Sequence, residues 1–409
     1  MTSRSLARYA AISFSALLLL TGCGGKQETA GSKKIVIWMQ MDPEERARFT
    51  KNVAAYEQAH PGVKIESVPY DTENLRQQFQ TAAGGGAGPQ IIFGPSDQVG
   101  PLSQLELIKP LDVALPKGFF DRFVPQSLDT LNGHLWAAPD QVGNHLMLVY
   151  NKKLVPTAPR TAAEFLATAK KLTQGGTYGF AMNVNEPYWL APFLAGYGGW
   201  VMDDKSIPTL DTQPMRDALA YLADLKNVQG IMPKESDYQI AETLFKEGKA
   251  AMIINGPWSW SGYRKSGIDL GVAPIWALPN GSPGRPMTAS KGYSVNVNVK
   301  DAGEMATVTD VITYLTSPQA ELLDAVALGI LPSDKTAWMD ASIQNDPILK
   351  SSQAGFDGGR RMPVVPEMRV IWDTMRPGLQ QVMNGSKKPA AAAKEMQAAA
   401  VQQIAGMKH

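Results

Sequence analysis

The side chains that could do chemistry in this sequence are aromatic rings and carboxylates that follow predicted strands. Trp258 comes shortly after the apolar run 250–254, and Glu186 and Tyr188 come shortly after the run 178–182. Open α/β sheets bind ligands at the carboxyl ends of their strands. Aromatic faces cover the C–H side of a pyranose ring, while carboxylates and amides pair with its hydroxyls. These residue types therefore indicate a site for a neutral sugar.

Each of these residues also has a plainer interpretation. Trp258 and Trp260 are two positions apart, so we expect them to face different ways, with Trp258 in a cleft and Trp260 in the core. Taken alone, Glu186 could be a surface acid and Tyr188 a packing aromatic. Trp372 lies at helical spacing and could equally be a core residue. Periodicity leaves these alternatives open.

The first residues of the chain have the pattern of a secretion signal. Arg4 and Arg8 precede an apolar run over 10–20, which ends in Leu-Thr-Gly before Cys23, the single cysteine of 409 residues. The run is too short to span a bilayer, and the residues at its end resemble the bacterial lipobox. We expect a signal peptide over 1–22, a lipidated Cys23 and a flexible polar tether over 23–33. With its only cysteine lipidated, the chain would form no disulfide.

Composition excludes several other classes of protein. The formal net charge is +1, which gives no electrostatic reason to expect a nucleic acid as partner. The four histidines show no ligand spacing, so we expect no metal, and we expect no other cofactor. The common hydrolase and nucleotide-binding motifs are missing from the sequence. A chain of this length predicts two domains.

The order of elements predicts an α/β fold. Strands over 34–38, 63–68 and 90–93 alternate with two helices, the first capped by Asp42 and Pro43 and the second over 72–83, which favours a parallel, doubly wound sheet. The pattern then starts again. Its predicted strands are 135–139, 146–150, 178–182, 250–254 and 292–299, and its predicted helices are 162–173, 213–227, 238–246, 303–315, 318–327 and a helical C-terminus from Pro363 that ends with 390–405.

Residues 236–260 resemble the signature of family 1 extracellular solute-binding proteins, and most of all the maltose/maltodextrin-binding proteins of ABC importers. Matching stretches follow in the same order at 35–38, 90–93, 150–152, 185–188, 198–200 and 362–372. The resemblance implies a periplasmic-binding-protein-like fold of two discontinuous α/β lobes, joined by a hinge with the ligand cleft between them. The lobes would comprise 34–142 with 292–315, and 146–287 with 318–409.

The resemblance also implies a set of ligand-binding positions. Trp258 and Trp372 would stack on sugar faces, and Asp42, Asp97 and Glu186 would hold hydroxyl groups. The complete implied set is Asp42, Asp97, Gln98, Asn144, Glu186, Pro187, Tyr188, Trp258, Trp372 and Asp373.

Several of these positions depart from the family pattern. Gly94 stands where the maltodextrin binders carry Trp, Pro43 where they carry Lys, and Gln98 where they carry Arg. Asn144 replaces an expected carboxylate, and Asp373 an aromatic residue. We expect Gln98, Asn144, Asp373 and the neighbouring His145 to change which sugar is bound.

The function that the resemblance implies is delivery of a sugar to an ABC transporter permease by hinge closure, performed by a monomer on the periplasmic or outer side of the membrane. A different disaccharide, a glycosyl polyol or a glycerol phosphodiester is the alternative ligand. A secreted glycoside hydrolase would need two carboxylates at a fixed separation. Glu186 and its possible partners Asp42 and Asp97 would come from opposite lobes, so we expect no enzyme.

Overall fold

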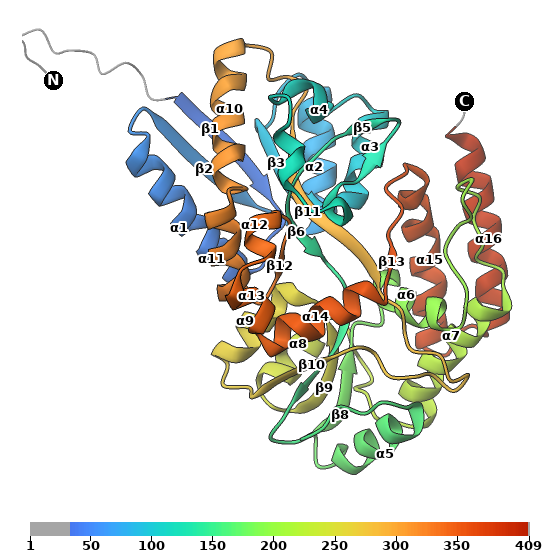
Figure 1. Cartoon of the computed structure of the whole chain (residues 1–409). Coiled ribbons are helices and arrows are strands. Elements are labelled where there is room, and N and C mark those ends of the chain that lie inside the picture. Colours follow the sequence, from blue (N-terminus) through green and yellow to red (C-terminus); the bar gives the residue numbers. More distant parts are fainter. Residues whose placement is uncertain (1–32, 408–409) are drawn as a thin grey trace, which may run out of the picture.

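The structure is a computed structural model that describes residues 33–407. The predicted signal peptide, almost all of the tether and Cys23 lie outside these residues. The chain forms two α/β lobes, each built on its own sheet (Figure 1). We call the part built on the seven-stranded sheet the first lobe, and the part built on the four-stranded sheet the second lobe.

The sheet of the first lobe has the order β12-β6-β11-β3-β1-β2, with β13 paired to β11. β1 pairs in parallel with β2 and β3, as predicted, whereas β11 runs antiparallel to β3 and β6. The sheet is therefore mixed. Its strands are β1 (Lys33–Met39), β2 (Val63–Pro69), β3 (Ile91–Pro95), β6 (Ala138–Gly143), β11 (Met287–Val295), β12 (Leu331–Pro332) and β13 (Arg360–Arg361), and β4 (Thr130–Leu131) and β5 (His134–Leu135) form a separate hairpin.

Helix α1 of the first lobe begins as the sequence predicts. Asp42 is its N-cap, Pro43 is its first residue, and Oε2 of Glu45 accepts a hydrogen bond from the Asp42 backbone N–H at 3.0 Å. Phe49 and Tyr56 of α1 are buried against the sheet. The helices near this sheet are α1 (Pro43–Ala59), α2 (Thr72–Gly84), α3 (Val99–Gln104), α4 (Leu111–Ala114), α10 (Ala302–Leu315), α11 (Pro318–Leu328), α12 (Lys335–Trp338), α13 (Ala341–Asn345) and α14 (Pro347–Asp357).

The second lobe is built on the order β10-β7-β9-β8, with β8 parallel to β9 and the other pairs antiparallel. Phe165 stacks on Trp276 in its core, with ring centroids 3.5 Å apart. Its strands are β7 (Met147–Asn151), β8 (Tyr178–Met182), β9 (Ala250–Asn255) and β10 (Leu270–Ala273), and its helices are α5 (Ala162–Leu172), α6 (Pro187–Gly196), α7 (Gln213–Ala223), α8 (Tyr238–Lys246), α9 (Pro257–Lys265), α15 (Glu367–Met383) and α16 (Pro389–Gly406).

Short segments connect the two sheets. β6 ends at Gly143 in the first sheet and β7 begins at Met147 in the second, so 144–146 is one crossing. β11 starts five residues before the predicted strand 292–299. β12 pairs with β6, so a segment that the prediction assigns to the second lobe adds a strand to the first sheet. The lobe boundaries themselves remain a prediction.

The C-terminal helical region differs from the prediction at its start. The predicted helix begins at Pro363, whereas α15 begins at Glu367. Pro363 and Pro366 disfavour helical backbone in the residues before them. Instead, 364–366 pack closely on Gly100 of α3, where an added Cβ would lie 2.3 Å from the Val364 carbonyl oxygen. None of the helices within 33–407 is long and apolar enough to cross a membrane.

Candidate functional site

Aromatic side chains of the second lobe form a continuous row. The ring centroids of Trp372 and Tyr188 are 6.2 Å apart, those of Tyr188 and Trp189 are 5.7 Å apart, and those of Trp189 and Trp258 are 6.4 Å apart. Tyr238 lies beside Trp189 at 5.8 Å. Helices α15, α6, α9 and α8 supply these five rings. The rings pack edge to face. Tyr188, Tyr238 and Trp258 are the partly exposed members, whereas Trp372 is 6% exposed. The partly exposed rings can offer apolar faces to a ligand.

Trp189 fixes the middle of this row. Its Nε1 donates a hydrogen bond to the carbonyl oxygen of Ile254, at the end of β9, at 2.9 Å. Only 9% of Trp189 is exposed, so it supports the neighbouring rings from beneath. Trp258 is partly exposed, whereas Trp260 is fully buried beside Phe245 and Tyr263. The expectation that Trp260 is the core residue of the pair is confirmed.

At one end of the row stands Asp42 of the first lobe. The Tyr238 hydroxyl donates to Asp42 Oδ2 at 3.1 Å and accepts a hydrogen bond from Trp258 Nε1 at 3.1 Å. Burial, followed by the negative charge of Glu45, raises the pKa of Asp42 to about 7. Asp42 thus lies at the interface of the lobes, in contact with the second lobe through a tyrosine.

At the other end stands Asp97 of the first lobe, in the short turn that follows β3. Its Oδ2 accepts a hydrogen bond from Trp372 Nε1 at 3.1 Å. Among the described residues its Oδ1 has no partner. Burial raises the pKa of Asp97 to about 6, although the Trp372 N–H opposes this by stabilising the charged form. Each end of the row therefore meets a first-lobe carboxylate that can accept hydrogen bonds from hydroxyl groups.

These raised pKa values predict a pH effect on stability. Folded Asp97 keeps its proton up to about pH 6, while the unfolded carboxyl loses it near its ordinary value of 3.8. Between these values unfolding releases a proton, so rising pH favours the unfolded state. We expect the melting temperature of the ligand-free wild type, relative to Asp97→Asn, to decrease between pH 4 and pH 7. A difference that stays constant or increases over this range would contradict the assignment.

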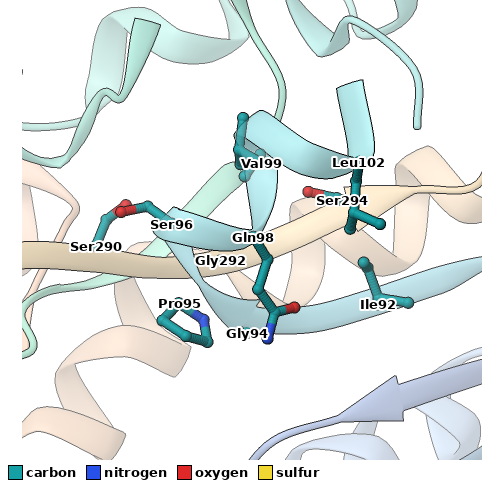
Figure 2. Close-up of a pocket in the computed structure, with 11 residues that line it drawn as sticks. Ile92, Gly94, Pro95, Ser96, Gln98, Val99, Leu102, Ser290, Gly292 and Ser294 are labelled. Atoms are coloured by element: carbon teal, nitrogen blue, oxygen red, sulfur yellow. The ribbon is translucent and has the colours of Figure 1, made fainter. Parts of the chain in front are cut away.

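A small hollow in the first lobe is lined by Gly94, Ser96 and Gln98 together with apolar residues of the same lobe (Figure 2). It has room for about one water molecule. Gln98 and Ser96 line it and are 6% and 3% exposed, and neither Gln98 Nε2 nor Ser96 Oγ has a partner within 33–407. The hollow thus combines these polar atoms with apolar lining residues, and an added Cβ at Gly94 would lie 3.0 Å from Gln98 Oε1.

Two of the predicted ligand positions are engaged by arginines. Arg376 Nε lies 3.0 and 3.1 Å from the two carboxylate oxygens of Glu186. Arg376 Nη1 also contacts Asp373 at 3.1 Å, and Arg369 Nε contacts Asp373 at 2.8 Å. Glu73 of α2 joins this network through Arg369. Glu186 and Asp373 can still accept further hydrogen bonds, but their charges are compensated.

The remaining predicted residues lie around the crossing between the sheets. Pro187 is the first residue of α6, and Glu186 is the N-cap of that helix. The Tyr188 hydroxyl donates a hydrogen bond to the carbonyl oxygen of Asn144. The backbone of Asn144 has a positive φ of 33°. His145 is fully buried, and its Nε2 lies 2.9 Å from the Ser352 carbonyl oxygen. Burial removes His145 from any surface that a ligand could contact.

The predictions from sequence missed five residues around this site. Trp189 and Tyr238 complete the aromatic row, while Glu73, Arg369 and Arg376 complete the charged network. The only available signal was on α15, where Arg369, Asp373 and Arg376 are spaced as helical ion pairs. In the part of the chain that the structure describes, no cluster of three or more His, Cys, Asp or Glu is placed to hold a metal ion.

Two α/β lobes with aromatic rings on one and carboxylates on the other define a ligand-binding protein of the two-lobed class. The chain belongs to the family of bacterial extracellular solute-binding proteins, whose model matches residues 51–351. It is 26% identical over 377 residues to the maltotriose-binding protein of Pyrococcus abyssi, covering 88% of this chain and 80% of that protein.

Solved structures agree with this assignment. The maltose/maltodextrin-binding domain MalE from Bdellovibrio bacteriovorus, bound to maltotriose, is 38% identical with a TM-score of 0.88, covering 91% of this chain and 99% of that one. The Thermus thermophilus maltotriose-binding protein, also bound to maltotriose, is 26% identical with a TM-score of 0.83, covering 90% of this chain and all of that one. The predicted two-lobed α/β fold is confirmed.

Proposed function

We propose that this protein binds a maltotriose-type oligosaccharide between its lobes and delivers it to the permease of an ABC importer. The observation that carries the proposal is the aromatic row of the second lobe with a first-lobe carboxylate at each end, Asp42 and Asp97. The partly exposed rings of the row can stack on pyranose faces, and the carboxylates can accept hydrogen bonds from the hydroxyl groups. The structures bound to maltotriose support the same class of ligand.

Delivery requires two distinguishable states of the protein. Because Asp42 and Asp97 contact second-lobe side chains directly, the structure corresponds to a closed arrangement of the lobes. A sugar entering the cleft would replace these contacts with its own, and hinge closure around it would produce the form that a permease recognises. We infer that the protein acts as a monomer on the outer side of the membrane, held there by a lipid on Cys23.

The site does not suit glycoside hydrolysis. A catalytic acid and its partner need a fixed separation, whereas Asp42 and Asp97 belong to one lobe and Glu186 to the other. Glu186 is further held by Nε and Nη2 of Arg376, so its carboxylate oxygens are already engaged in an ion pair. We therefore propose binding without catalysis.

Calorimetric titration and thermal melting with maltose, maltotriose, trehalose, sucrose and glycerol 3-phosphate test this function. Maltotriose at 100 times its Kd should stabilise the protein by about 2.7 kcal/mol. A response to another disaccharide alone would keep the fold and mechanism but change the ligand, as the departures at Gly94 and Gln98 allow. A response to glycerol 3-phosphate alone would refute the carbohydrate assignment.

A further inference from the structure

An ion pair joins the two lobes beside the aromatic row. Arg369 lies one helical turn before Trp372 on α15, and its Nη1 is 2.5 Å from Oε1 of Glu73 on α2. Arg376 Nη2 lies 3.9 Å from the same oxygen. The Arg369 side chain is 18% exposed, so this contact is partly shielded from water. α2 packs on the first sheet and α15 packs in the core of the second lobe, so the pair spans the interface.

Both partners have a second ion-pair partner within their own lobe. Arg76 Nη2 lies 3.3 Å from Glu73 Oε2 on α2, and Asp373 accepts from Arg369 Nε at 2.8 Å on α15. Separation of the lobes would therefore break the Arg369–Glu73 contact without leaving either charge unpaired. The planar guanidinium of Arg369 holds Asp373 through Nε and Nη2 while Nη1 contacts Glu73, so one side chain reaches both carboxylates in a fixed geometry.

We propose that Arg369 and Glu73 form a latch that is made only when the lobes close, and that raises ligand affinity without touching the ligand. This proposal rests on the proposed function, because it assumes that the lobes open and close around a ligand. A contact present only in the closed form shifts the open–closed equilibrium toward closure and lowers the apparent Kd by the same factor. Arg369 is then a positioning residue rather than a ligand-contacting one.

A double-mutant cycle with maltotriose tests the latch. Glu73→Gln and Arg369→Gln should each raise Kd by roughly twofold to fivefold, the size expected of a partly exposed ion pair. The change should appear mainly as faster dissociation in stopped-flow tryptophan fluorescence. The double variant should bind no more weakly than the weaker single variant, because each substitution removes the same contact. High salt should reduce the difference from wild type.

Lys387→Gln and Glu395→Gln are the matched controls, since they break an ion pair that lies wholly within the second lobe. Both should leave Kd unchanged. Independent effects of Glu73→Gln and Arg369→Gln that add in the double variant would overturn the latch, as would equal losses in the controls.

Small-angle scattering of the ligand-free protein tests the latch without any sugar. The Glu73→Gln/Arg369→Gln double variant should have a larger radius of gyration than wild type at low salt, because more molecules are open. Equal radii would overturn the latch. This result stands even if no sugar binds, an outcome that would contradict the proposed function alone.

Discussion

Replacing Lys291 with methionine is expected to lower the free energy of unfolding by about 3–5 kcal/mol, the cost of leaving a buried charge without its partner. Lys291 on β11 is 2% exposed and Glu45 on α1 is 4% exposed. Lys291 Nζ contacts both oxygens of Glu45, at 2.9 and 3.1 Å, and Gln141 Nε2 donates to the same carboxylate at 3.1 Å. Without Lys291, Glu45 must either stay charged in the core or take up a proton.

The chain offers a matched control for this substitution. Lys265 lies 3.8 Å from Glu44, the neighbour of Glu45, but its side chain is 64% exposed. Lys265→Met should change stability by no more than about 0.5 kcal/mol, since surface ion pairs contribute little. Denaturant unfolding measures both variants. If Lys291→Met cost less than about 1 kcal/mol, the pair would not be the desolvated contact that the structure describes.

A second variant separates the lost pair from the lost packing. Lys291→Met combined with Glu45→Gln removes both charges, and it should recover much of the stability lost in Lys291→Met alone. Glu45 also caps α1 through the Asp42 N–H, so the recovery depends on whether glutamine keeps that hydrogen bond. The pair thus connects the stability of the first lobe to the position of Asp42 in the candidate site.

Local sequence patterns were sufficient for most of the elements. The cap at Asp42 and Pro43 and the glycines after α2 mark helix ends through backbone chemistry that acts within a few residues. In contrast, β12 and β13 are two residues each, too short for any periodicity, and exist only because β6 and β11 lie beside them. The direction of β11 is likewise set by strands that are distant in sequence.

The same distinction applies to the site. Trp258, Asp42 and Asp97 follow strands or lie at helix starts, so their positions at the edges of the sheets could be predicted. Trp372 lies inside α15, and only the resemblance pointed to it. The pairing of Glu186 with Arg376 could not be predicted, because 190 residues separate them and the sequence around each is typical of an exposed charged residue. The burial of Lys291 could not be predicted from the sequence either, since lysine is usually exposed.

The largest expected effect on binding is that of Trp258→Ala, which should raise the Kd for maltotriose about 100-fold. Aromatic side chains at the centre of an interface commonly contribute 2 kcal/mol or more when truncated. Trp258 is partly exposed beside Trp189, and its Nε1 donates to the Tyr238 hydroxyl that contacts Asp42. The substitution therefore removes a stacking face and also releases Tyr238, which links the row to the first lobe.

Two further variants separate these two effects in calorimetric titrations. Trp258→Phe keeps an aromatic face but loses the hydrogen bond to Tyr238, so its Kd should lie between those of wild type and Trp258→Ala. Trp338→Ala is the control, because Trp338 is also partly exposed but lies on α12, packed against a separate core cluster of the first lobe. Trp338→Ala should lower the melting temperature. It should leave Kd within about twofold of wild type, because Trp338 and the aromatic row belong to different core clusters and their effects should be independent. If Trp258→Ala bound maltotriose with a Kd within threefold of wild type, the ligand would not stack on this ring. The part of the aromatic row that contacts the ligand would then not extend beyond Tyr188 and Trp372.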